Sequence, residues 1–296
     1  MGYEADTYLS SGSNVLKVLE YNSGGNLYGI NMLKVSRILN EAQGFRSLLN
    51  ANPCIRGAFN DHGKIITLID LNHFLGGPLT SMEGRYRIII CEFFGTMNGL
   101  LVDRVEAVHT LLWEKVISAD EVFDNNQNPY VVSIVQPTED KMLLLLDYET
   151  IIMELSPEKA VKEQEKTKKL AINGKGLRVL VADDSPSIRS LLKQELVDAG
   201  FTVLTARDGE DAWEILGRES IDLLVSDVEM PKMDGLALTK KVRDKYREPT
   251  LPIIVYSSIG DIGMKERARF LKAEHITKLQ MDELLEKTVY LLKDKL

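Results

Sequence analysis

The chain has 296 residues, of which 44% are hydrophobic and 27% are charged, and its formal net charge is −8 at pH 7. This composition is typical of a soluble globular protein, and the length predicts about two domains. The negative charge argues against nucleic acid as the main ligand, because phosphate binding needs clustered Lys and Arg. No apolar run approaches the ~20 residues of a membrane helix, so no direct membrane insertion is expected.

The N-terminus and the cysteines both favour a cytoplasmic protein. Residues 1–13 are polar and have no basic region before an apolar core, so they predict a tail rather than a secretory signal. Cys54 and Cys91 show no CxxC or metal spacing, which predicts core thiols in a reducing compartment.

The first part of the chain, residues 14–155, is dominated by short apolar runs separated by turn residues. The runs predict strands at residues 14–21, 27–30, 64–69, 86–94, 99–102, 130–135 and 141–146. Helices are predicted at residues 31–40 and 71–75. Many short strands with turn signals between them, such as Ser23-Gly24-Gly25 and Asn125-Asn126, are typical of small barrels or a sandwich. We therefore predict an all-β first domain.

Residues 156–176 mark a change in composition. They are rich in Lys and Glu, poor in apolar side chains, and contain Gly174 and Gly176 near their end. Such a stretch is typical of a linker between domains.

The last part, residues 177–296, alternates strands with amphipathic helices. Strands are predicted at residues 177–182, 202–205, 221–226, 253–256 and 274–277. Helices are predicted at residues 187–199, 209–218, 236–246, 262–271 and 281–292. This alternation predicts an α/β, doubly wound, five-stranded parallel sheet, which places functional sites at the carboxyl ends of its strands.

Polar side chains follow four of these strands. Asp183 and Asp184 follow the first strand and Asp227 the third, while Ser257 follows the fourth and Lys278 the fifth. An Asp after a strand is often only a helix cap, but that role does not explain the coincidence at four strand ends. Three clustered carboxylates need a cation, and dense oxygen ligands suit Mg²⁺. One carboxylate can then form an acyl phosphate, whose charge a lysine would neutralise.

The motifs around these residues resemble the receiver domains of two-component response regulators. They are Val-Ala-Asp183-Asp184-Ser, Ser-Asp227-Val-Glu-Met-Pro231-Lys-Met-Asp234-Gly235, Leu-Pro252-Ile-Ile-Val-Tyr-Ser257-Ser, and Lys278. The resemblance implies phosphoryl transfer from a phosphohistidine on a sensor kinase to Asp227, with Ser257 as the switch hydroxyl. It also implies that Mg²⁺ is held by Asp183, Asp184, Asp227 and the backbone carbonyl of Glu229.

Three positions depart from the usual receiver pattern. His275 occupies the place of the common aromatic switch residue, and Leu279 follows Lys278 where a proline usually makes a cis bond. Because a non-proline cis bond costs about 2.5–4 kcal/mol, we expect this loop to take a different shape. Glu229 adds a carboxylate beside the phosphoryl group, and we expect it to alter hydrolysis by acting on the attacking water.

Residues 1–155 contain no recognisable catalytic constellation. His62, His73 and His109 are scattered, and we expect His62 and His73 to be non-catalytic. Trp113 lies beside two leucines and is predicted to be core, and the stretch from 92 to 99 is predicted to be core or a hairpin.

The order of segments in the first part is similar to a CheW-type chemotaxis coupling domain, over residues 14–155. The matching segments are Tyr28-Gly-Ile-Asn-Met-Leu-Lys-Val-Ser-Arg-Ile-Leu39, Ile55-Arg56-Gly57-Ala-Phe-Asn60-Asp-His62-Gly63-Lys-Ile-Ile-Thr-Leu-Ile-Asp70-Leu71, Arg87-Ile-Ile-Ile90 and Gly99-Leu-Leu-Val-Asp103-Arg-Val105. The resemblance implies two small five-stranded barrels side by side and a scaffolding role. One face would bind the cytoplasmic tip of a chemoreceptor and another the regulatory domain of the histidine kinase CheA. His62 replaces an arginine that the family often has there.

Together the two resemblances, and the opening Leu9-Ser-Ser-Gly-Ser-Asn14, identify a CheV-type protein. Such a protein is a signalling adaptor rather than an enzyme acting on a small molecule. It would be cytoplasmic and recruited to membrane-associated receptor arrays, and phosphorylation of Asp227 would tune coupling or adaptation. The alternative is a phosphate sink that drains phosphoryl groups from the kinase. A transcriptional regulator is disfavoured, because no helix-turn-helix segment follows the receiver.

Overall fold

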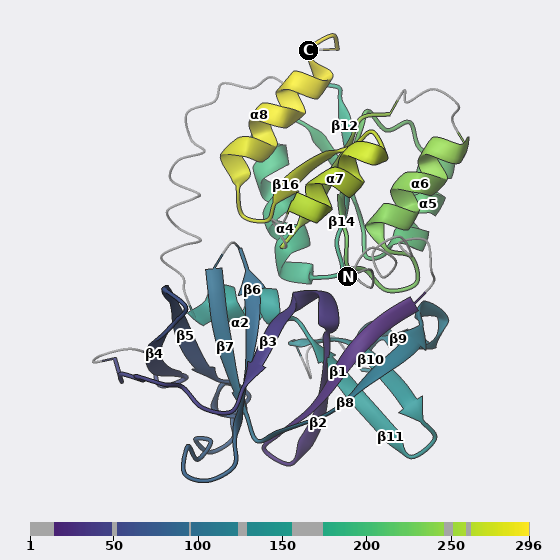
Figure 1. Cartoon of the computed structure of the whole chain (residues 1–296). Helices are drawn as coiled ribbons and strands as arrows, with labels where there is room; N and C mark the ends of the chain where they lie inside the picture. Colours follow the sequence, from purple (N-terminus) through teal and green to yellow (C-terminus); the bar gives the residue numbers. More distant parts are fainter. Residues whose placement is uncertain are drawn as a thin grey trace, which may run out of the picture. The chain divides into compact units, whose positions relative to one another are not determined.

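The computed structural model describes residues 15–48, 52–94, 96–123, 129–155, 174–245, 251–258 and 262–295. The described residues form two compact units, one over 15–155 and one over 174–295 (Figure 1). The predicted tail at 1–13, most of the predicted linker at 156–176, the turn at Asn125-Asn126 and the end of the helix predicted at 236–246 lie outside them. No helix among the described residues is long and apolar enough to cross a membrane.

A six-stranded sheet makes up one half of the first unit. Its strands run in the order β8 (Arg104–Leu112), β1 (Val15–Ser23), β2 (Asn26–Asn31), β11 (Lys141–Leu146), β10 (Val131–Thr138) and β9 (Val116–Ser118). Neighbours are antiparallel except β2 and β11, which are parallel. One core cluster contains Leu111 of β8 and Val116 of β9, so residues of both edge strands share one interior, as in a small barrel. Trp113 belongs to this cluster, which confirms its predicted core position.

A five-stranded sheet makes up the other half. Its order is β3 (Val35–Leu39), β6 (Arg87–Phe93), β7 (Thr96–Val102), β5 (Lys64–Asp70) and β4 (Ile55–Asp61). Arg37 on β3 forms an ion pair with Asp61 on β4, so the two edge strands are joined by charge. The predicted hairpin at 92–99 is confirmed by the pairing of Phe93 with Thr96.

Another core cluster contains residues of both sheets. It contains Leu19 and Tyr21 of β1, Ile89 and Cys91 of β6, and Tyr148 of the helix α2 (Tyr148–Leu155). The hydroxyls of Tyr21 and Tyr148 lie 2.7 Å apart in this fully apolar setting, and burial raises the pKa of both. The core-thiol prediction is confirmed for Cys91, while Cys54 is half-buried against the same cluster.

Two details of the first unit differ from the sequence prediction, and a third agrees with it. The helix predicted at 31–40 is wrong: a 3₁₀ turn, η1 (Met32–Lys34), leads into strand β3. Val35 pairs with Cys91 and Ile38 with Ile89, so strand pairing with a distant segment overrides the local helical spacing. The first barrel has six strands rather than five, because the short β9 adds to β10. The helix predicted at 71–75 is confirmed as α1 (Leu71–Phe74).

The second unit is a five-stranded parallel sheet in the order β13-β12-β14-β15-β16, which confirms the predicted doubly wound fold. Its strands are β12 (Arg178–Ala182), β13 (Thr202–Ala206), β14 (Leu223–Asp227), β15 (Ile253–Ser257) and β16 (Glu274–Thr277). Its helices are α4 (Pro186–Asp198), α5 (Gly209–Arg218), α6 (Gly235–Lys245), α7 (Ile262–Phe270) and α8 (Met281–Leu292). Figure 1 shows α4 and α8 on one side of this sheet and α5 and α6 on the other. Strands β14 and β15 are buried at every residue, as expected when helices cover both faces.

Two of the buried carboxylates in the first unit connect several of its strands through charged and polar contacts. Asp70, at the end of β5, is fully buried and accepts hydrogen bonds from the Thr80 amide and hydroxyl, each at 2.8 Å. Arg56 donates to the same carboxylate at 2.8 Å and to the Thr80 carbonyl at 2.7 Å. Asp70 also caps α1 through the His73 amide. Asp70 therefore fixes the segment around Thr80 against β4 and β5.

Glu20 on β1 is the second buried carboxylate. One oxygen pairs with His109 Nε2 of β8 at 2.6 Å, and the other accepts from Lys141 Nζ of β11 at 2.8 Å. Burial raises the pKa of this carboxyl, but the hydrogen bonds to Lys141 and His109 outweigh it, so the pKa lies below its ordinary value of 4.5. The ionised carboxylate thus ties three strands together.

Replacing Asp70 with Ala is expected to destabilise the first unit by about 3–5 kcal/mol, because it leaves the Arg56 charge without its buried partner. Each unit contains one tryptophan, Trp113 or Trp213, so urea unfolding in a Trp213→Phe background reports the first unit alone. Asp140→Ala, at an exposed turn, is the matched control and is expected to change stability by less than about 1 kcal/mol. Equal stability of the two variants would contradict the role given to Asp70.

Glu20→Gln is expected to cost about 1–3 kcal/mol at neutral pH. Because the folded-state pKa of Glu20 is lowered, its ionised form contributes stability that is complete above its ordinary pKa of 4.5. That contribution is lost as the pH falls through the lower folded-state pKa, so the wild-type and Glu20→Gln curves should converge in acid. Urea unfolding between neutral pH and pH ~3 measures this. A stability difference that stays constant across the range would contradict the linkage, and Glu106→Gln on the exposed side of β8 serves as control.

Candidate functional site

A sharp strand-to-helix turn positions the first two acidic residues. Strand β12 ends at Ala182, and Ser185 caps α4 by accepting from the Ile188 amide, with Pro186 at the first helical position. These are strong helix-start signals, so the chain turns directly after Asp183 and Asp184. The Ser185 amide also donates to Asp183 Oδ1 at 2.9 Å, and Arg189 donates to the Asp183 carbonyl at 2.6 Å.

The third acidic residue, Asp227, is the last residue of β14. Its Oδ1 accepts from the Val228 amide at 2.6 Å. The loop that follows closes back on the strand, because the Gly235 amide donates to the Val228 carbonyl at 3.0 Å. A Cβ at Gly235 would lie 1.8 Å from the Asp227 carbonyl oxygen, so only glycine fits there. The Asp-Gly pair at 234–235 in the sequence motif is therefore a packing requirement of the site.

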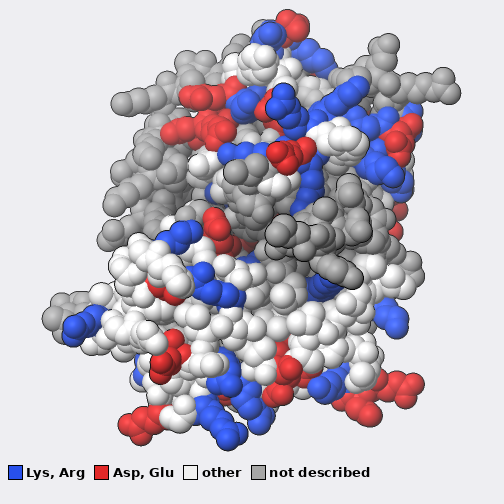
Figure 2. Space-filling view, viewed as in Figure 1, with Lys and Arg blue, Asp and Glu red and all other residues white. Residues whose placement is uncertain are grey.

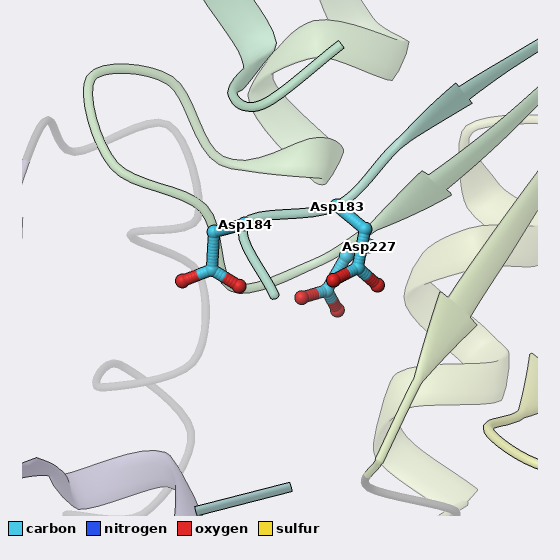
Figure 3. Close-up of side chains that lie close together, drawn as sticks. All are labelled: Asp183, Asp184 and Asp227. Atoms are coloured by element: carbon cyan, nitrogen blue, oxygen red, sulfur yellow. The ribbon is translucent and has the colours of Figure 1, made fainter. Parts of the chain in front are cut away.

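The three carboxylates meet at the carboxyl edge of the sheet. One oxygen from each of Asp183, Asp184 and Asp227 lies within 4.8 Å of the others. Figure 3 shows the three side chains projecting to the same side of the strand ends, with those of Asp183 and Asp227 next to each other. Asp183 and Asp227 are buried, whereas Asp184 is half-buried.

Lys278 brings a positive charge into this cluster. Its Nζ lies 2.8 Å from Asp183 Oδ2 and 3.0 Å from Asp227 Oδ2, and the side chain is 0% exposed. The ammonium contacts two of the three carboxylates, and a divalent cation bound beside it would also offset their negative charge. Carboxylate oxygens in this number are the donor set that suits Mg²⁺.

Ser257 and Lys278 reach the site from neighbouring strands. Ser257 ends β15 and is buried, and Lys278 follows β16. The Lys278 amide donates to the Ser257 carbonyl at 2.9 Å, which continues the pairing of Ser257 with Thr277. The structure therefore brings together all five residues that the sequence placed at strand ends.

The three departures from the receiver pattern lie around this site. Glu229 sits two residues after Asp227 and is buried. His275 is half-buried on β16, paired with Val255. The bond between Lys278 and Leu279 is trans, and Leu279 has φ of 65°, in the left-handed region that non-glycine residues rarely adopt. Sequence reasoning missed Tyr256, whose hydroxyl accepts from the Leu279 amide at 2.7 Å. A tyrosine inside an apolar strand was the available signal, since a buried hydroxyl needs a partner.

Among the described residues of the first unit, no group of three or more acidic, histidine or cysteine side chains gathers as the three aspartates do. Figure 2 shows that uncharged side chains predominate over much of its face in view. Its exposed large apolar side chains are Leu33, Ile38, Leu48, Ile65, Leu79, Val108, Leu112, Ile117, Val122 and Met142. His62 lies in the turn between β4 and β5 with φ of 49°, and its ring is largely exposed.

Two family models match separate parts of the chain. Residues 179–289 match the response regulator receiver domain, and residues 17–156 match the CheW-like domain. Among solved structures, the scaffolding protein TtCheW from Thermoanaerobacter tengcongensis is 26% identical and covers 45% of this chain and 88% of its own, with a TM-score of 0.41. The response regulator protein TrrA from Thermotoga maritima, in complex with Mg²⁺ and BeF, is 33% identical over 39% of this chain and 99% of its own, with a TM-score of 0.36.

Two relatives match almost the whole chain. Chemotaxis protein CheV2 from Helicobacter pylori is 22% identical over 92% of this chain and 92% of its own length. Chemotaxis protein CheV3 from the same organism is 33% identical over 88% of this chain and 86% of its own length. With a CheW-like domain and a receiver domain joined in this order, the chain belongs to the CheV family of chemotaxis coupling proteins.

Proposed function

We propose that this chain couples chemoreceptors to the histidine kinase CheA and that phosphorylation of Asp227 changes that coupling. The observation that carries the proposal is the placement of Lys278 Nζ between Asp183 and Asp227, in a cluster of three carboxylates at the carboxyl ends of the strands. The domains are proposed to span 14–155 and 177–296, joined by a linker at 156–176. Family membership supports the general scaffolding role.

Asp227 is the proposed phosphoryl acceptor. A carboxylate oxygen attacks the phosphorus of a phosphohistidine, the P–N bond breaks as the P–O bond forms, and the freed imidazole takes up a proton from solvent. Lys278 now contacts Asp227 Oδ2 at 3.0 Å, so a short movement lets it pair with a phosphoryl oxygen instead. The Ser257 hydroxyl then donates to another phosphoryl oxygen. Mg²⁺, bound by Asp183, Asp184, Asp227 and the Glu229 carbonyl, would supply the remaining positive charge.

The first unit is the proposed docking module. Its exposed apolar side chains and the edge strands β3, β8 and β9 of its two sheets provide surfaces for the chemoreceptor tip and for the regulatory domain of CheA. Through the receptor, a cytoplasmic protein would be recruited to membrane-associated arrays. A new dianion on Asp227 would act on this module by repacking the receiver around Ser257.

A phosphate sink is the second candidate function. In that case the receiver takes phosphoryl groups from CheA, and the CheW-like domain only holds the receiver near the kinase. The same acidic cluster supports both functions, so binding measurements have to separate them.

Acetyl phosphate with Mg²⁺ is expected to add one phosphoryl group to the full chain, detected by mass spectrometry. Asp227→Ala should abolish this, while Asp198→Ala, exposed at the end of α4, should retain it. Phosphorylation is further expected to change the affinity for a receptor-tip fragment or for CheA by about fivefold or more. Drainage of phosphoryl groups from CheA with unchanged affinities would favour the sink, and a phosphorylated Asp227→Ala variant would refute the acceptor assignment.

Glu229→Ala is expected to lengthen the lifetime of the acyl phosphate by about tenfold or more, because the carboxylate acts on the attacking water as a base. The lifetime is measured after removal of the phosphodonor. Glu229→Gln keeps the size and hydrogen-bonding capacity but not the charge, so it should resemble Glu229→Ala if the base role is correct. An unchanged lifetime in Glu229→Ala would show the idea to be wrong.

A further inference from the structure

Lys278 lies in a loop in which the next residue has an unfavourable backbone conformation. Leu279, the next residue, has φ of 65° and is 8% exposed. A leucine adopts this left-handed conformation only where the surroundings impose it. The register of β15 with β16 ends at the pair Ser257 and Thr277, so Leu279 lies beyond the strand ladder. The Leu279 amide therefore needs a hydrogen-bond acceptor other than a backbone carbonyl of the strand pairing.

Tyr256 supplies that contact. It is on β15, is 0% exposed, and its hydroxyl accepts from the Leu279 amide at 2.7 Å. The same hydroxyl donates to the Met281 sulfur, at 3.7 Å, in the first residue of α8. A buried amide without a partner is costly, so this hydroxyl stabilises the left-handed turn directly.

The two residues at the end of β15 thus hold two successive amides of the loop. The Ser257 carbonyl accepts from Lys278 and the Tyr256 hydroxyl from Leu279. Lys278 is fixed on both sides of its Cα, and its Nζ then reaches Asp183 and Asp227 at 2.8 and 3.0 Å. A lysine has four rotatable side-chain bonds, so its placement depends on how firmly its backbone is held.

We propose that Tyr256 is a positioning residue, whose hydroxyl holds the Lys278–Leu279 turn so that Lys278 lies between Asp183 and Asp227. For phosphoryl transfer this rests on the proposed function of Asp227. The placement of the lysine itself does not depend on that function, and it can be measured separately.

The test uses the full chain with Tyr256→Phe, which removes only the hydroxyl. The Lys278 ammonium signal in NMR is expected to shift and broaden toward that of exposed lysines, and the Leu279 amide should exchange faster. Phosphorylation by acetyl phosphate at saturating Mg²⁺ should slow by about tenfold or more. Because displacing Lys278 removes a positive charge that competes with the metal for Asp183 and Asp227, Mg²⁺ should bind at least as tightly as in the wild type, so weaker metal binding would not explain the slower rate. Tyr290→Phe makes the same chemical change at a side chain that is 60% exposed and should leave all four readouts unchanged.

A second substitution distinguishes positioning from loss of packing. Glycine adopts positive φ without the steric penalty of a Cβ. Leu279→Gly therefore removes the backbone strain of the left-handed turn, so the turn no longer needs the Tyr256 hydroxyl to form. The double variant Tyr256→Phe with Leu279→Gly is therefore expected to recover the lysine signal and most of the rate. A defect that persists in the double variant would assign the effect to packing and overturn the proposal.

An unshifted lysine signal in Tyr256→Phe would also overturn the proposal. A wild-type chain that acetyl phosphate does not phosphorylate would instead contradict the proposed function. In that case the lysine signal and the Leu279 exchange rate still decide the role of Tyr256.

Discussion

The ion pairs of Lys278 with Asp183 and Asp227 are the interaction on which the receiver site depends. All three side chains are buried, so the charges interact in a medium of low dielectric and dominate the local energetics. Removing the lysine would leave two adjacent buried carboxylates that repel each other. The lysine therefore reduces the repulsion between the two carboxylates in the folded protein. The same ammonium can also pair with an anion that is added at Asp227.

The sheet topology explains why these charges meet. Strands β12, β14 and β15 are neighbours and parallel, so their carboxyl ends lie at one edge although Ala182 and Ser257 are far apart in the chain. Short local devices then set each side chain: the Ser185 cap turns the chain after Asp184, and Gly235 lets the following loop approach Asp227. The Tyr256 hydroxyl belongs to the same class of device, because it fixes backbone and not substrate.

The receiver could be predicted almost completely from the sequence because its signals are local. Each strand is a short apolar run that ends in a polar residue, and helices of regular period separate the strands. The first unit was harder, since its structure depends on distant pairing. Residues 31–40 have helical spacing, yet Val35 and Ile38 lie in strand β3, which pairs with the distant strand β6 that begins at Arg87. The contact between the Glu20 carboxylate and the His109 ring joins residues that are 89 positions apart in the chain, and no local sequence pattern predicts it. Tyr256 was missed for a related reason: its partner, the Leu279 amide, exists only in the folded turn.

Buried charged groups have different roles in the two units, and the arrangement of the carboxylates shows the difference. Asp70 has one arginine and three further donors, and Glu20 has a lysine and a histidine, so each carboxylate is matched within its own barrel. Removing one partner from such a matched network is strongly destabilising, because it leaves a buried charge uncompensated. At the receiver edge, one lysine faces three carboxylates. Three carboxylates gathered at the carboxyl ends of parallel strands are the donor set that suits a divalent cation, and this arrangement distinguishes the receiver site from the two structural networks.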